Sequence, residues 1–69
     1  MGFAVTVRRY CDYKMTYFVQ ETNEERAKQK AYQRAKETCN CYMPETIEEF
    51  ENGYFGDIEV GAKIDQIIL

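Results

Sequence analysis

The spacing of apolar residues changes twice along this chain, and that change constrains the fold more than any other feature. In "FAVTVRRY", Phe3, Val5 and Val7 alternate with small or polar residues, which is the pattern of a half-buried strand. A second run, "YKMTYFVQE", alternates in the same way and is rich in aromatic and β-branched residues. The intervening "CDYK" contains Asp12, a common turn residue. The two runs therefore predict an antiparallel hairpin.

Residues 22–41, "TNEERAKQKAYQRAKETCNC", have the spacing of a helix instead. Small side chains recur at every fourth position, which would let the helix lie close to a sheet: Ala27, Ala31, Ala35 and Cys39. Thr22 stands three residues before Glu25, the spacing of a capping box. We expect a helix over about residues 23–39.

A second, shorter helix is expected in "YMPETIEEFENG". Pro44 suits the first helical position and Gly53 suits the end of a helix. Ile47 and Phe50 would form its apolar face, with Tyr54 one turn later.

The last segment, "YFGDIEVGAKIDQIIL", returns to alternation, with Gly61 in the middle of the run. It predicts two short strands, about 57–60 and 63–68, in preference to one long bent strand in which Gly61 is a bulge, so the expected order is β-β-α-(short α)-β-β. The whole chain of 69 residues then forms a single α+β domain, a small, mainly antiparallel sheet with one main helix packed on one face. A right-handed crossover through the helix would place the third strand beside the first and parallel to the second. The uncovered face should expose Arg8, Thr16, Phe18, Gln20 and Glu59.

Several classes of chemistry lack the residues they need. The chain has no His and no glycine-rich phosphate loop, and no nucleophile stands beside an identifiable base. Cys39 and Cys41, with Cys11, fall one ligand short of a structural zinc site. We therefore expect no enzyme activity, no cofactor and no metal, with reduced cysteines in a cytoplasmic protein. No apolar run is long enough to span a membrane, and the N-terminus does not read as a secretory signal.

Charge is distributed unevenly. Residues 1–39 hold eight basic against five acidic residues, a net charge of +3, whereas residues 40–69 hold one against seven, a net charge of −6. An acidic surface of this kind is complementary to a basic surface, for example the groove of a host protein that normally holds nucleic acid. The candidate partner-binding residues are Glu45, Glu48, Glu49, Glu51, Asp57 and Glu59.

Two alternatives stay open. Arg26, Lys30 and Arg34 form a row on the long helix and could contact phosphates in a small nucleic-acid-binding regulator. The net charge of −3 argues against that alternative, because it repels a polyanion at long range. A homodimer built on the open sheet face or on an edge strand is the other alternative.

The layout also carries a resemblance. A strand pair followed by "ETNEERAKQKAYQRAKE" and "GDIEVGAKID" resembles the small acidic accessory proteins of phages and plasmids, such as the DpnD/PcfM-like group, and is similar in size and order to several phage anti-CRISPR proteins. The "CNCYMPETIEEF" insert has no counterpart in that pattern, and the helix is more basic than the pattern usually shows. The resemblance implies a protein-binding, mobile-element inhibitor of a host defence protein, and it carries over no individual residue.

Overall fold

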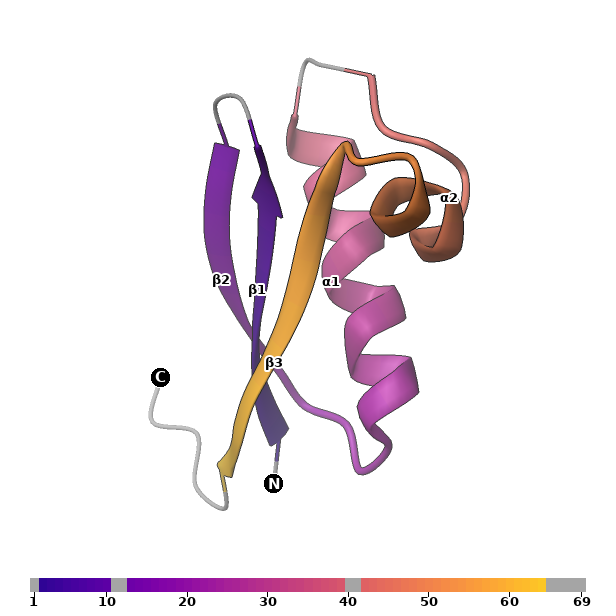
Figure 1. The fold of residues 1–69 in the computed structure, drawn as a ribbon. Helices are drawn as coiled ribbons and strands as arrows, with labels where there is room; N and C mark the ends of the chain where they lie inside the picture. The colour runs from indigo at the N-terminus through magenta and orange to yellow at the C-terminus, as the bar shows by residue number, and fades with distance from the viewer. Residues whose placement is uncertain (1, 11–12, 40–41, 65–69) are drawn as a thin grey trace.

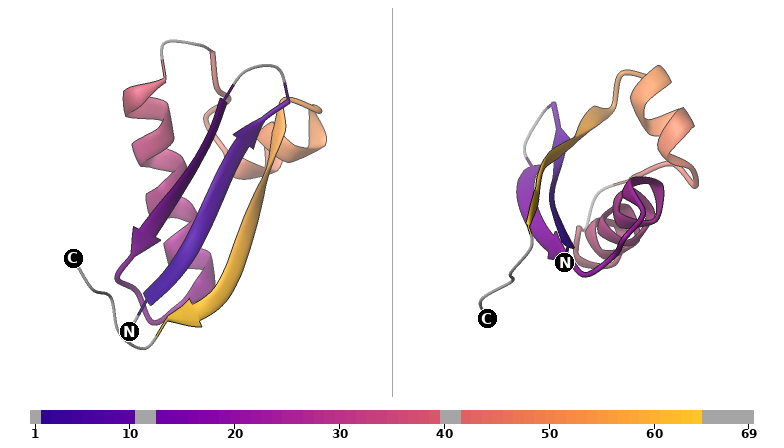
Figure 2. Two further views of the ribbon diagram at one scale, coloured as in Figure 1. Left: turned by 90° about the vertical axis from the view of Figure 1, so that its left-hand side faces the viewer. Right: turned by 90° about the horizontal axis from the view of Figure 1, so that it is seen from below.

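The computed structural model describes residues 2–10, 13–39 and 42–64. In chain order, its elements are β1 (Gly2–Arg9), β2 (Tyr13–Val19), α1 (Glu24–Thr38), α2 (Ile47–Asn52) and β3 (Gly56–Ile64) (Figure 1). The strands form one sheet in the order β2-β1-β3, and both neighbouring pairs are antiparallel. The third strand thus lies beside the first and parallel to the second, as predicted. Helix α1 covers one face of the sheet, and no other described helix or strand covers the opposite face, which we call the open face (Figure 2). This confirms the expected small α+β fold.

The two faces of the sheet follow the predicted alternation. Val5 and Val7 of β1 are fully buried under α1, and Ile58 of β3 is buried beside them. Asp12, the expected turn residue between β1 and β2, lies outside the described residues. The open face exposes the side chains that the sequence placed there: Arg8, Thr16, Phe18, Gln20 and Glu59.

Helix α1 lies close to the sheet because its row of alanines is fully buried: Ala27, Ala31 and Ala35. The expected capping box at Thr22 is wrong. Asn23 is the N-cap, and its side-chain Oδ1 accepts hydrogen bonds from the backbone N–H groups of Glu25 (2.8 Å) and Arg26 (3.2 Å). An asparagine one residue nearer the helix satisfies two otherwise unpaired donors, so it displaces the threonine.

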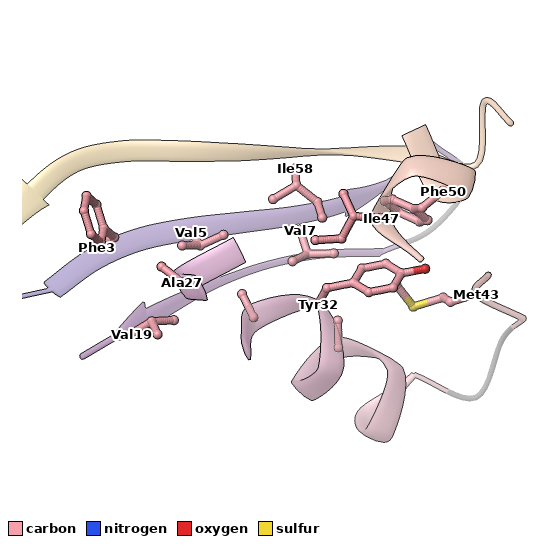
Figure 3. Close-up of a cluster of buried hydrophobic side chains, with 12 residues drawn as sticks. Phe3, Val5, Val7, Val19, Ala27, Tyr32, Met43, Ile47, Phe50 and Ile58 are labelled. Atoms are coloured by element: carbon pink, nitrogen blue, oxygen red, sulfur yellow. The ribbon is translucent and has the colours of Figure 1, made fainter. Parts of the chain in front are cut away.

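The core contains one large α1 side chain that the alanine row did not indicate. Tyr32 is fully buried, and its ring lies 5.2 Å from that of Phe50 in α2, between ring centroids, at an interplanar angle of 58°. Figure 3 shows Tyr32 between Met43 and the α2 side chains Ile47 and Phe50. This cluster holds α2 and the segment before it against the rest of the core.

Helix α2 begins later than expected. Thr46 is its N-cap, and the hydroxyl oxygen accepts a hydrogen bond from the N–H of Glu49 at 3.1 Å. Pro44 therefore precedes the helix and is buried, and the expectation that it opens the helix is wrong. Gly53 does end the helix, as predicted. The expectation that Tyr54 continues the apolar face is also wrong, since its side chain is 84% exposed.

Strand β3 is continuous from Gly56 to Ile64, so the preferred expectation of two strands separated near Gly61 is wrong within the described residues, and the single bent strand is correct. Its pairing with β1 shifts by one residue between Phe3 and Val5, opposite Gly61, which places a bulge there. Residues 65–68 of the expected fourth strand lie outside the described residues.

Candidate protein-binding surface

The structure divides the predicted acidic residues between two places. Asp57 and Glu59 lie on the open face of β3, and Asp57 Oδ2 is 2.6 Å from Arg8 Nη2 on the neighbouring strand. The other four lie in or just before α2, where Glu51 is half-buried and the rest are exposed: Glu45, Glu48, Glu49 and Glu51. The acidic half of the chain therefore does not form one continuous surface.

Of the four carboxylates at α2, Glu48 and Glu49 are the two that combine full exposure with the absence of an ion pair within the described residues. Glu45 Oε2 lies 3.5 Å from Lys36 Nζ, so Glu45 already forms an ion pair within the chain. Among the described residues, no Lys or Arg forms an ion pair with Glu48 or Glu49. Their position in the first turn of α2 is favourable, because the helix dipole stabilises negative charge there.

The same two glutamates border an open groove with a volume of about 630 Å³. We call it the acidic–aromatic groove, and its lining residues are Tyr42, Pro44, Thr46, Glu48, Glu49, Asn52, Gly53 and Phe55. Tyr42 and Phe55 meet edge to face, with ring centroids 5.8 Å apart and an interplanar angle of 63°. Both rings are exposed large apolar side chains, at 69% and 39% respectively. The groove therefore combines aromatic surface with unpaired carboxylates.

Phe55 is held in the groove by the turn that ends α2. The N–H of Gly53 donates to the carbonyl of Glu49 at 2.9 Å, and the N–H of Phe55 donates to the carbonyl of Phe50 at 3.2 Å. A Cβ at position 53 would lie 2.7 Å from the Phe55 ring, so glycine permits this close approach. The carbonyl of Phe55 accepts a hydrogen bond from the N–H of Tyr10 at 3.1 Å, which joins the turn to the end of β1.

Tyr54 lies within this turn in the left-handed region, with φ of 60°, the one described non-glycine residue with positive φ. Glycine or asparagine usually occupies such a position, because a side chain there crowds the following carbonyl. A highly exposed tyrosine in this conformation makes no packing contribution that would offset its backbone strain. The turn thus displays an aromatic side chain next to Phe55 at a cost in stability.

Sequence reasoning missed the aromatic part of this surface. The groove residues Tyr42 and Phe55 are not among the expected partner-binding residues, and neither is Tyr54, the exposed neighbour of Phe55 in the chain. The sequence does contain a signal for it, the aromatic pair directly after Gly53. Because Gly53 ends the helix, these two rings do not belong to its apolar face, and large apolar side chains outside that face can indicate a binding surface.

Two of the three residues in the basic row of α1, Lys30 and Arg34, form ion pairs within the chain. Lys30 Nζ lies 2.7 Å from Glu21 Oε2, and Arg34 Nη1 lies 3.5 Å from Glu37 Oε2. The hydrogen bond from Lys30 is the main cause that lowers the pKa of Glu21, and the charge of Arg26 lowers it further. The row therefore pairs with acidic residues of the first half of the chain rather than with the acidic second half.

Of the three cysteines considered as metal ligands, Cys39 is the one within the described residues. Cys39 ends α1, is half-buried and packs against the core, which fits its expected place at the end of the alanine row. Arg9 Nη1 donates a hydrogen bond to its Sγ at 3.7 Å. Cys11 and Cys41 lie outside the described residues, and the described residues contain no group of three metal-ligating side chains.

No protein-family model, no curated protein and no solved structure matches this chain. Within the described part of the chain, neither helix is both long and apolar enough to cross a membrane.

Proposed function

We propose that this chain is a non-enzymatic accessory protein that binds a basic surface of another protein through the acidic–aromatic groove. One observation carries the proposal: Glu48 and Glu49 are exposed, form no ion pair with any described residue, and line the same groove as the rings of Tyr42 and Phe55. Carboxylates attract guanidinium and ammonium groups, and aromatic faces attract the same cations through their quadrupole. Arginine fits this combination best, because its planar group can stack on a ring and pair with a carboxylate.

The layout resemblance suggests a finer role. A partner that normally holds nucleic acid presents a basic groove, and an inhibitor carried by a phage or another mobile element would block that groove by charge complementarity. A host defence protein of the type targeted by anti-CRISPR proteins is such a partner. The net charge of −3 would speed this encounter at low salt.

A fluorescein-labelled nona-arginine peptide tests the groove directly, with anisotropy as the readout and a nona-lysine peptide for comparison. We expect the double variant Glu48→Lys/Glu49→Lys to bind nona-arginine at least about tenfold more weakly than the unaltered chain. The control is Glu24→Lys/Glu37→Lys, which has the same net charge but alters exposed glutamates of α1. If both double variants lose affinity equally, binding reflects overall charge and the groove proposal fails.

A second substitution separates the aromatic contribution from the acidic one. Phe55→Ala should weaken binding of nona-arginine more than binding of nona-lysine, because arginine gains more from stacking on a ring. An equal loss for both peptides would show that the ring does not contact the cation.

The nucleic-acid alternative has its own test. Titration of labelled single-stranded and duplex DNA at about 50 mM salt favours phosphate contacts, which weaken as salt rises. We expect no binding there, because Lys30 and Arg34 are paired with Glu21 and Glu37. Binding that is lost in Arg26→Ala/Arg34→Ala would instead support the regulator.

A further inference from the structure

Within the described residues the sheet has two edge strands, β2 and β3, which differ in the features that discourage pairing with another strand. An edge strand presents unpaired backbone groups, and natural proteins discourage additional pairing with charges or bulges. Strand β3 has both, since it exposes Glu59, carries Asp57 and contains the bulge at Gly61. Strand β2 carries Lys14 as its one charged residue and pairs with β1 without a register shift.

Strand β2 also exposes a large apolar side chain on each of its sides. Met15 pairs with the fully buried Val7, so it lies on the core-facing side, yet it is 48% exposed. Phe18 lies on the open face and is 62% exposed. The hydrophobic layer between sheet and helix therefore stops short of this edge and leaves apolar surface that an added strand would cover.

We propose that a second copy of this chain pairs with β2 in antiparallel orientation, so that two three-stranded sheets join into one. Full overlap of Tyr13–Val19 with its own copy requires Thr16 to face Thr16 across a two-fold axis. In that register paired residues point to the same side of the sheet, because their numbers differ by an even count. Both α1 helices then lie on the same side, and the apolar layers become continuous.

The position of the single charged residue of β2 favours a second copy of this chain as the strand that pairs with it. In this register Lys14 faces the ring of Phe18 rather than another lysine, so like charges do not meet and the ammonium can contact an aromatic side chain. Met15 faces Tyr17, which is half-buried and packed against the core. In this register the strand therefore keeps its like charges apart and meets its own copy through apolar and aromatic side chains.

Such a dimer would leave the acidic–aromatic groove accessible. The groove lies at α2, which contacts β3, and β3 is the edge away from β2 (Figure 1). The inference does not rest on the proposed function, but it would give the assembly two copies of the groove.

Sedimentation equilibrium of the full chain from about 1 to 500 μM tests the proposal, because the dimer should have twice the 8.2 kDa monomer mass. Phe18→Lys places two ammonium groups opposite each other and should raise the dimer dissociation constant at least about tenfold. Phe18→Glu instead places a carboxylate opposite Lys14 and should retain the dimer. Combining Lys14→Glu with Phe18→Lys should restore association.

The fold of each variant is checked by circular dichroism, and the substituted side chains are exposed in the monomer, so the monomer should stay folded. The control Tyr54→Lys adds the same charge at an exposed position away from β2 and should leave the dimer unchanged. A monomer at every concentration would overturn the proposal. Equal effects of Phe18→Lys and Phe18→Glu would overturn the register on which it depends.

Discussion

The phenol hydroxyl of Tyr32 in α1 donates a hydrogen bond to the backbone carbonyl of Pro44, and both side chains are fully buried. This contact joins the middle of α1 to the segment that leads into α2. Because the Tyr32 ring also packs against Phe50, one side chain fixes α2 through both polar and apolar contact. The groove residues on α2 therefore depend on Tyr32 for their position.

Tyr32→Phe should destabilise the protein by about 1–3 kcal/mol, because it keeps the ring but leaves a buried carbonyl without its donor. Urea denaturation measures the change. Tyr42→Phe is the matched control, since the Tyr42 side chain is exposed and its loss of a hydroxyl should change stability by less than about 0.5 kcal/mol. Equal effects of the two substitutions would show that the Pro44 hydrogen bond contributes nothing.

The same tyrosine predicts a loss of stability at alkaline pH. Burial, and to a lesser degree Tyr42, Glu49 and Glu45, raises the pKa of Tyr32 to about 12. A tyrosine in the unfolded chain has a pKa near about 10, so at higher pH the folded state retains a proton that the unfolded state releases. The contribution of protonated Tyr32 to the free energy of unfolding is therefore fully present below about pH 10 and is lost as pH rises towards about 12.

The measurement compares urea denaturation of the unaltered chain and Tyr32→Phe from about pH 8 to about pH 11.5. The stability difference between them should shrink above about pH 10. Tyr17, whose pKa is also raised, mainly by burial, is present in both proteins, so its titration cancels. A difference that stays constant with pH would contradict the assignment to Tyr32.

The start of α1 offers a comparison of neighbouring residues. Asn23→Ala removes an acceptor for two backbone N–H groups and should cost about 1 kcal/mol, whereas Thr22→Ala should be nearly neutral. Thermal or urea denaturation of both variants distinguishes the observed cap from the capping box that the sequence suggested. A larger loss for Thr22→Ala would reverse the assignment.

Periodicity predicted the parts of this fold that depend on one element meeting a larger layer. The alternation through Val5 and Val7 and the four-residue spacing of Ala27 and Ala31 each specify a buried face, so they gave the strands, α1 and the open side of the sheet. Local hydrogen-bond competition decided the rest. Asn23 and Thr22 are both good caps in sequence, and the backbone geometry alone selects between them.

The candidate site was less predictable than the fold. Charge clustering identified Glu48 and Glu49, because net charge can be counted along the chain. It also grouped Asp57 with them, since counting cannot show that alternation in β3 turns Asp57 to the open face beside Arg8. The place of Phe55 in the groove follows Tyr54, a left-handed residue directly after Gly53, and no periodic pattern indicates that conformation.

Two glycines of β3 should respond differently to an added methyl group. A Cβ at Gly56 would overlap the carbonyl of Arg8 and lie 2.5 Å from the Phe50 ring, whereas at Gly61 the nearest atom, the carbonyl oxygen of Ala4, is 3.3 Å away. Gly56→Ala should cost more than about 3 kcal/mol and Gly61→Ala less than about 1 kcal/mol. Denaturation measures both, and similar losses would show that β3 can shift away from β1.

At Tyr54, which lies between the groove residues Gly53 and Phe55 in the chain, we expect stability and binding to oppose each other. Tyr54→Asn replaces tyrosine with a residue that tolerates positive φ and removes an exposed ring, so it should stabilise the protein by up to about 1 kcal/mol. If the displayed ring contacts a partner, the same substitution should weaken binding of the nona-arginine peptide about threefold or more.

Tyr42→Asn is the comparison, because it removes an exposed ring of the groove without relieving strain, and it should weaken binding with no gain in stability. A Tyr54→Asn variant that is more stable and binds the peptide as tightly as the unaltered chain would show that Tyr54 is not part of the binding surface. A variant with unchanged stability would show that the turn accommodates tyrosine at no cost.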